Sequence, residues 1–319
     1  MKQSADISKT RFRAKHKDLA SFFGTGVTAF ATLLVVAILL IILGNIAVNG
    51  LPHLSWRFVT TGTASDMFDV NKAGILPMIY GTAARVFLMT ILVLPAGVMT
   101  AIYLTEYARM NSPFTRIIRG AVNNLAGVPS IVFGLFGAGF FVRFIGRSLD
   151  AAFYPARAAT VWGQPALLWA SATLAVMTLP VVIVATEESL RAIPQGLREA
   201  SLALGATKLE TIRKVVLPQA IPGIMTGAIL AISRAAGEVA PILFTGAAYY
   251  MRDLPRSLHD QFMDLGYHIF ILSTQSPDVD KTRPILYATV LVLLILTFTL
   301  NIAAIFVRAS MRKKLRMLH

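Results

Sequence analysis

Six apolar stretches constrain the fold of this chain more than any other feature. They occupy residues 27–48, 75–104, 121–144, 165–185, 221–245 and 284–307. Each reaches about the 20 residues that an α-helix needs to cross a bilayer. In hydrocarbon every backbone N–H and C=O group must bond within the protein, so spans of this kind fold as helices. The sequence therefore predicts an all-α integral membrane protein with six transmembrane helices.

Composition and charge distribution agree with a membrane protein and not with a nucleic-acid reader. The chain is 55% hydrophobic and 14% charged, and its formal net charge is +14. The basic residues cluster beside the spans and at both ends of the chain, where they meet anionic inner-leaflet lipid. We therefore expect a multi-pass protein of a bacterial-type cytoplasmic membrane, with both termini cytoplasmic and no nucleic-acid partner.

The spans and their flanks divide the chain into five parts. These are a basic cytoplasmic segment (1–26), a first transmembrane anchor (27–48), an extracytoplasmic loop (49–73), a five-helix transmembrane domain (74–307) and a basic cytoplasmic tail (308–319). The anchor is longer than the apolar core of a secretory signal, and no cleavage site follows a short core, so we expect it to stay uncleaved. In the second and third spans, Pro95 with Gly97 and Gly127 with Pro129 each predict a break or kink.

The sequence lacks the residues for catalysis, metal binding or ATP hydrolysis by familiar devices. It contains no cysteine, and its five histidines show no spacing typical of a metal site. It also contains no Gly-x4-Gly-Lys-Ser/Thr phosphate loop. We therefore expect no cofactor, and any chemical energy that the protein uses must come from a partner.

Three ionisable residues lie inside the apolar spans. Arg234 and Glu238 are four residues apart, so on a helix they share one face and can pair, whereas Arg85 has no acid in its own turn. A charge near the bilayer centre costs at least about 2.5–3.5 kcal/mol, so such residues face a protein interior or an aqueous path. An arginine fork suits a tetrahedral oxyanion. All three are therefore candidates for a substrate path, and the alternative is a buried ion pair that joins helices. Pro241 predicts a proline kink at Gly237.

The extracytoplasmic loops carry two further groups of charges. Arg143, Arg147 and Arg157 flank the third and fourth spans, where they would attract an anion, meet an acidic partner, or simply contact lipid and solvent. The acidic residues of the last loop are balanced by nearby bases and predict a solvated docking surface: Asp253, Asp260, Asp264, Asp278 and Asp280.

The loop at about 189–219 has a patterned sequence between two spans. Residues 195–204 favour a short helix that Gly205 can close in the left-handed conformation. Thr207 and Glu210 then form a capping box that starts a second short helix, expected to end near Val216. The alternative is an ordinary solvated cytoplasmic loop.

The same loop resembles the EAA loop of type I ABC importer permeases. The matching residues are Glu199, Ala200, Ser201, Gly205, Leu217 and Pro218, with Ser201 in place of a second alanine. The resemblance implies that these residues couple the chain to a cytoplasmic ATPase, and that the fold is that of a type I importer permease.

Three further segments are similar to the phosphate-specific branch of ABC permeases (the Pst system). They are residues 123–137, 234–241 and 272–277, and the last outer loop and short tail look more like the A-type subunit than its C-type partner. The resemblance implies inward transport of inorganic phosphate by alternating access. It also implies a second permease subunit in a heterodimer, two cytoplasmic ATPase subunits and an extracytoplasmic phosphate-binding protein. Two alternatives remain: a permease for another oxyanion or polar solute, and a membrane scaffold or sensor without transport.

Overall fold

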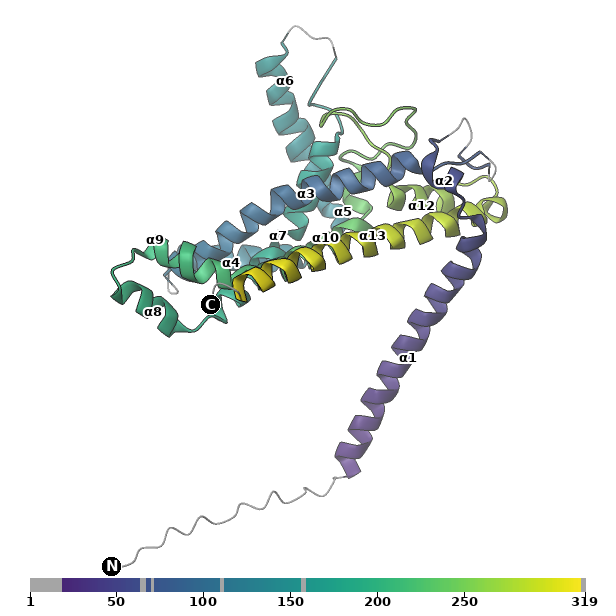
Figure 1. The fold of residues 1–319 in the computed structure, drawn as a ribbon. Helices are drawn as coiled ribbons and strands as arrows, with labels where there is room; N and C mark the ends of the chain where they lie inside the picture. The colour runs from purple at the N-terminus through teal and green to yellow at the C-terminus, as the bar shows by residue number, and fades with distance from the viewer. Residues whose placement is uncertain (1–18, 64–66, 70–71, 110–111, 156–158, 317–319) are drawn as a thin grey trace, which may run out of the picture. The chain divides into compact units, whose positions relative to one another are not determined.

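The computed structural model describes residues 19–63, 67–69, 72–109, 112–155 and 159–316. The chain separates into two compact units, Met1–Val48 and Asn49–His319. The described residues are mainly helical, and the β-structure among them is an isolated bridge between Ala247 and Phe262. Figure 1 shows this arrangement of helices.

Six helical segments are long and apolar enough to cross a membrane, which confirms the predicted number. They are Phe22–His53, Leu76–Tyr107, Ser130–Phe153, Leu167–Arg191, Lys208–Gly237 and Val279–Met311. The first belongs to α1 (Leu19–Gly50), whose apolar side chains are exposed all round, as in Leu33 and Ile41. A bilayer provides the solvent for such a helix.

The second unit begins with short elements and three long helical stretches. In order they are η1 (Leu51–His53), α2 (Trp56–Thr60), α3 (Leu76–Ile102), the π-helical η2 (Tyr103–Tyr107), α4 (Pro113–Ala126), α5 (Ser130–Gly137), the π-helical η3 (Ala138–Gly146), α6 (Arg147–Phe153) and α7 (Leu167–Arg191). The remainder comprises α8 (Gln195–Ala203), α9 (Lys208–Thr211), the π-helical η4 (Ile212–Val216), α10 (Leu217–Gly237), α11 (Ala240–Leu243), α12 (Leu265–Thr274) and α13 (Val279–Arg316). Within this unit α8 and α9 lie at one end, and α2 and α12 at the opposite end (Figure 1).

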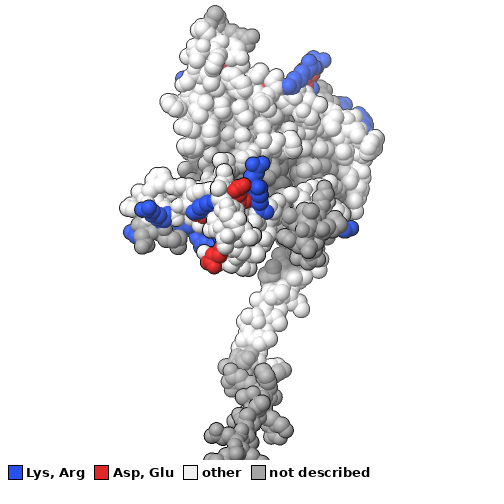
Figure 2. Space-filling view, turned by 60° about the vertical axis from the view of Figure 1, so that its left-hand side comes forward, with Lys and Arg blue, Asp and Glu red and all other residues white. Residues whose placement is uncertain are grey.

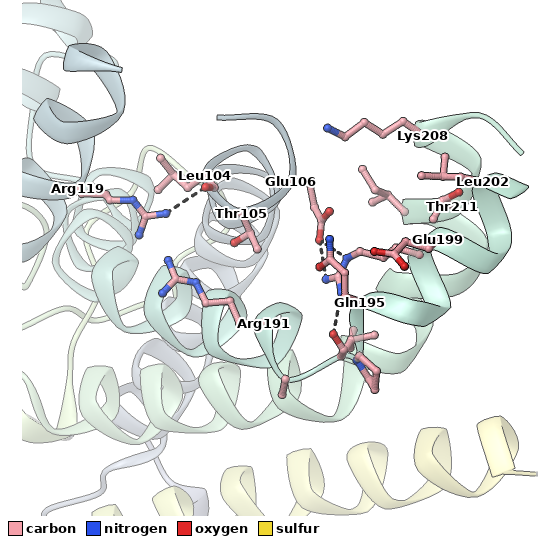
Figure 3. Close-up of a pocket in the computed structure, with 15 residues that line it drawn as sticks. Leu104, Thr105, Glu106, Arg119, Arg191, Gln195, Glu199, Leu202, Lys208 and Thr211 are labelled. Atoms are coloured by element: carbon pink, nitrogen blue, oxygen red, sulfur yellow. Dashed lines mark hydrogen bonds and ion pairs between the residues drawn. The ribbon is translucent and has the colours of Figure 1, made fainter. Parts of the chain in front are cut away.

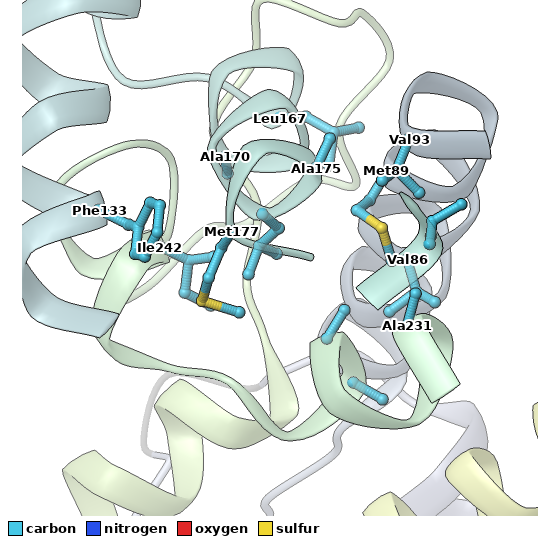
Figure 4. Packing of buried hydrophobic residues seen from close by; sticks show 14 of the residues in the cluster. Val86, Met89, Val93, Phe133, Leu167, Ala170, Ala175, Met177, Ala231 and Ile242 are labelled. Atoms are coloured by element: carbon cyan, nitrogen blue, oxygen red, sulfur yellow. The ribbon is translucent and has the colours of Figure 1, made fainter. Parts of the chain in front are cut away.

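Helix α7 forms the centre of the second unit, packed against α3, α5 and α10. Figure 4 shows the buried core around α7, in which Met177 lies beside Phe133 of α5 and Ile242 of α11, and Val86 of α3 lies near Ala231 of α10. Small residues let the helices approach: a Cβ on Gly97 would lie 2.6 Å from Val182 Cγ1. Close van der Waals packing of this kind is what associates helices in lipid, where the hydrophobic effect between them is weak.

The structure sharpens two of the expected interruptions. At Pro95, where a break or kink was predicted, helix α3 continues without a break, and a π-helical segment follows later, at η2. The break at 127–129 is present, but it separates α4 completely, so the third span runs over Ser130–Phe153 and not over 121–144. Proline at position 129 disfavours helical backbone at the residue before it, which explains the gap.

The fifth span also differs from the prediction at both ends. The second helix of the patterned loop does not end near Val216 but runs through η4 directly into α10. At the other end α10 stops at Gly237, and Glu238 is extended, with φ −80° and ψ 126°. The expected kink is therefore a full interruption of the helix. Pro241 has no N–H to donate to the carbonyl four residues earlier, so α10 cannot continue through it. Pro241 instead lies in the first turn of the separate helix α11, a position that proline favours.

Candidate functional site

The patterned loop lies at one end of the second unit and closes as the sequence predicts. Gly205 has φ +86°, the one positive value among the described residues. Its N–H donates to Leu202 O at 3.0 Å, and the Ala206 N–H donates to Ser201 O at 3.2 Å. These two bonds form a Schellman motif, which satisfies carbonyls that the end of α8 would leave unpaired.

The second helix of the loop begins with the predicted capping box. The Glu210 N–H donates to Thr207 Oγ1 at 3.3 Å, and the Thr207 N–H donates to Glu210 Oε2 at 3.0 Å. The hydroxyls of Ser201 and Thr211 lie 2.9 Å apart and join the two short helices. The loop is therefore a helix–turn–helix element whose two short helices are held in place by hydrogen bonds.

That surface combines charge with exposed apolar side chains. Glu199, Ala200 and Gly205 are exposed, and Ser201 is half-buried. Leu204 is 90% exposed and Leu209 is 65% exposed. Figure 2 shows charged side chains gathered at this end, below a surface almost without charge.

Leu217 and Pro218 do not belong to the exposed tip of the loop. Both are half-buried, and Leu217 packs on a cluster that contains Val216, Ala220 and Leu190. They support the base of the element, where it enters α10.

Arg198 anchors α8 to the ends of two spans. Its Nη2 lies 2.8 Å from Glu106 Oε1, in an ion pair whose side chains are 13% and 10% exposed. It also donates from Nη1 to Ile193 O at 2.7 Å and from Nη2 to Leu190 O at 2.8 Å. The prediction missed this arginine, because Glu106 lies 92 residues away in the sequence.

A cavity of about 700 Å³ opens between α8 and the ends of α3 and α7 (Figure 3). Two of the arginines that line it pair with Glu187 of α7, which is not part of the lining: Glu187 Oε2 lies 2.9 Å from Arg119 and 3.2 Å from Arg191. Arg119 also donates to Leu104 O at 3.0 Å. The cavity thus lies where the loop meets the membrane-spanning helices, and ion pairs connect the elements around it.

The second part of the site is the interrupted end of α10. Arg234 Nε lies 3.5 Å from Glu238 Oε1, although the helix ends between the two residues. Their side chains are 41% and 23% exposed, so the pair is not sealed in the core of this chain. The structure therefore leaves Arg234 and Glu238 accessible from outside the chain's packed interior.

Arg85, by contrast, is fully buried, and its guanidinium bonds to a carboxylate and to two backbone carbonyls. Its Nη2 lies 2.8 Å from Asp264 Oδ2, and both side chains are 0% exposed. Its Nη1 donates to Ala235 O at 2.7 Å and its Nη2 to Ala236 O at 3.3 Å. The expectation that Asp264 belongs to a solvated docking surface is wrong, because this aspartate is the counter-ion of Arg85.

The other charges predicted for these loops are at the surface where the structure describes them. Arg143 and Arg147 are exposed, and Arg157 lies outside the described residues. The remaining acids of the last loop make local contacts, such as the 3.1 Å ion pair of Asp278 with Lys281 and the 3.2 Å pair of Asp280 with Arg283.

The chain is similar to known transport permeases over most of its length. It matches the family described as "Binding-protein-dependent transport system inner membrane component" over residues 93–317. It is 30% identical over 313 residues to "Probable ABC transporter permease protein YqgI" of Bacillus subtilis, covering 94% of this chain and 99% of that protein. It is 32% identical over 285 residues to "Phosphate transport system permease protein PstA 1" of Mycobacterium tuberculosis (strain H37Rv), covering 85% and 86%.

A solved structure has the same fold. The chain matches a component of a bacterial ABC transporter involved in the import of the acidic polysaccharide alginate with a TM-score of 0.61. The match covers 92% of this chain and 98% of that one at 14% identity, so it supports the fold alone. The family match, the two relatives and the six membrane-spanning helices together show that this chain belongs to the inner-membrane permease family of ABC importers.

Proposed function

We propose that this chain is the A-type permease subunit of an ATP-driven importer that moves inorganic phosphate across the cytoplasmic membrane by alternating access. The observation that carries the choice of substrate is the accessible Arg234 at the interrupted end of α10. It stands in a chain that is 32% identical over most of its length to a phosphate permease. An arginine fork presents paired donors to a tetrahedral oxyanion.

The α8–α9 element is the proposed contact with a cytoplasmic ATPase. Its exposed Glu199 and Leu204 supply a charged and an apolar contact on a rigid helix–turn–helix. Motion of the ATPase would then reach α7 and η2, which continues α3, through Arg198, which bonds to Leu190 of α7 and to Glu106 of η2. In this proposal Leu217 and Pro218 transmit the same motion into α10.

In the proposed assembly, partner subunits supply the ATP hydrolysis and the solute capture that an importer needs. It pairs with a second permease subunit in a heterodimer, with two ATPase subunits on the cytoplasmic side and an extracytoplasmic phosphate-binding protein. Both termini and the α8–α9 element lie in the cytoplasm, consistent with the basic flanks of the spans. Arg143 and Arg147 would then lie on the outer side, where they raise the local concentration of an arriving anion.

The test is ATP-dependent uptake by the reconstituted complex, with phosphate, sulfate and molybdate as competing solutes. We expect phosphate-selective uptake that falls about tenfold or more in Arg234→Gln, because a lost bond to a charged group typically weakens binding by that factor. Lys313→Gln is the matched control, since it removes an exposed positive charge from the end of α13. Normal uptake by assembled Arg234→Gln complex would contradict the role of Arg234.

One competing function has specific support. The relative that covers 94% of this chain carries a permease name without a stated solute. Transport of another oxyanion would retain the loop, the interruption and Arg234. Selective uptake of sulfate or molybdate in the same assay would favour this alternative, whereas uptake of phosphate alone would exclude it.

A further inference from the structure

The buried end of α10 has carbonyls that its own helix satisfies only in part. The last four carbonyls of a helix have no i+4 partner, and two of them here belong to Ala235 and Ala236, which are 0% and 1% exposed. The N–H of the cap residue Glu238 donates to Ala235 O at 3.3 Å. A buried carbonyl without a partner is costly, and in a membrane protein water offers no general replacement. A donor from another element is therefore needed for the Ala236 carbonyl, and it can also strengthen the long bond at the Ala235 carbonyl.

Arg85 of α3 meets this requirement. Its guanidinium donates to the carbonyls of Ala235 and Ala236, which are two of the three residues between Arg234 and Glu238. Its positive charge also faces the negative end of the α10 dipole. Arg85 therefore contacts the backbone that connects the two accessible charged residues.

Asp264 fixes the guanidinium from the opposite side. Its Oδ2 accepts from Arg85 Nε at 3.0 Å and from Thr82 Oγ1 at 2.9 Å. Its Oδ1 accepts from the Tyr267 N–H at 3.2 Å and so caps the start of α12. The Leu265 N–H in turn donates to Thr82 Oγ1 at 3.0 Å. One buried network thus joins α3, the end of α10 and the start of α12.

We infer that Arg85 and Asp264 are a positioning pair that holds the interrupted end of α10 and thereby sets the placement of Arg234 and Glu238. The donors of Arg85 are directed to protein atoms and its side chain is 0% exposed, so it acts on the path through the backbone and not by touching the solute. The effect on transport rests on the proposed function; the effect on the helix end does not.

The test uses the absence of cysteine from the sequence. Gly237→Cys places a reporter at the last residue of α10, where an added Cβ meets nothing within 4 Å. Gly139→Cys is the control reporter, because a Cβ there also meets nothing within 4 Å. Each is labelled with a nitroxide in the full chain in lipid, and the ratio of mobile to immobile spectral components is measured.

Each reporter is measured in further variants that distinguish loss of the positioning pair from a general change in packing. Arg85→Met with Asp264→Leu replaces the ion pair by apolar side chains, a change that buried pairs often tolerate without loss of folding. Thr82→Val is the matched control, because it removes a buried hydroxyl from the same network and leaves the bonds from Arg85 to the carbonyls. Arg85→Lys retains the charge but cannot bond both carbonyls and the carboxylate with the fork of an arginine.

We expect the mobile-to-immobile ratio at position 237 to rise about tenfold or more in the double variant, less in Arg85→Lys, and less than about twofold in Thr82→Val. The ratio at position 139 should not change. An unchanged ratio at 237 in folded double variant, or an equal rise at 139, would overturn the inference. If the double variant does not fold, Arg85→Lys decides: an unchanged ratio at 237 overturns it and a selective rise supports it.

Transport measurements then separate this inference from the choice of solute. In the assembled complex, Arg85→Lys should raise KM for phosphate while the amount of complex stays constant. If the wild-type complex instead imports another solute, the proposed substrate is wrong, and the spectra at positions 237 and 139 still test the positioning pair.

Discussion

Arg198 offers the sharpest test of how the loop is attached to the membrane-spanning helices. Its guanidinium donates four hydrogen bonds, two to Glu106 Oε1 at 3.2 Å and 2.8 Å, and one each to the carbonyls of Ile193 and Leu190, at 2.7 Å and 2.8 Å. Figure 3 shows Glu106 beside α8 at the rim of the cavity. The perturbation is Arg198→Ala, which removes all four bonds and leaves Glu106 without this partner.

The magnitude follows from the burial of the pair. Breaking a buried ion pair by removing one partner costs about 3–5 kcal/mol. The side chains of Arg198 and Glu106 are 13% and 10% exposed, so screening reduces that figure only partly and we take the lower end, about 3 kcal/mol. Helix α8 has 9 residues, too few to be stable in water without packing. A cost of about 3 kcal/mol shifts the balance between attached and detached α8 by about a hundredfold.

Hydrogen exchange at the amides of α8 measures that shift directly. We expect exchange in Arg198→Ala to be about a hundredfold faster over residues 195–203, with little change in α7. The assembled complex should then hydrolyse ATP without proportionate uptake. Arg213→Ala is the control, because Arg213 is an exposed arginine on the neighbouring η4. Unchanged exchange in Arg198→Ala, or an equal increase in Arg213→Ala, would refute the assignment of Arg198 as the anchor.

Two glycines give further predictions. Gly205→Val forces a β-branched residue to φ +86° and should destabilise the turn by about 1–2 kcal/mol or more. We expect the variant to insert normally into the membrane but to lose co-purification with the ATPase. Wild-type coupling would contradict the docking role. Gly146→Ala directs a Cβ against the backbone oxygen of Trp162 and should destabilise the outer region by about 1–3 kcal/mol; Gly139→Ala, which meets open space, should leave the thermal midpoint nearly unchanged, and equal midpoints for the two variants would contradict the packing argument.

Local sequence patterns were sufficient to predict the loop. The left-handed Gly205 and the capping box of Thr207 with Glu210 depend on bonds within a few residues, and both are present. The prediction that the second helix ends near Val216 was wrong, because η4 continues directly into α10. Val216 and Ala220 pack there against Leu190 of α7, and this tertiary contact supports the continuous helix.

The role of Asp264 shows where the sequence was insufficient. The aspartate lies among exposed acids in the last outer loop, so its local context favoured solvent, yet it is buried against an arginine 179 residues earlier. Sequence also identified Arg85 as a buried charge that needs a partner, without indicating which acid or which carbonyls provide it. The third span was predicted to start too early because the last residues of α4, 121–126, were counted with α5 as one apolar stretch, although α4 as a whole is amphipathic.

The sequence by itself determined the class of fold, the number of spans and the form of the loop between the fourth and fifth spans. These depend on apolar length and on hydrogen bonds between near neighbours, which are written in consecutive residues. Only the tertiary structure decided that α10 is interrupted at Gly237, that Arg85 and Asp264 bond at its end, and that Arg198 ties α8 to η2 and α7. Each of these depends on which distant groups meet when the helices pack, because a buried charge or carbonyl is satisfied by the donor that packing brings to it.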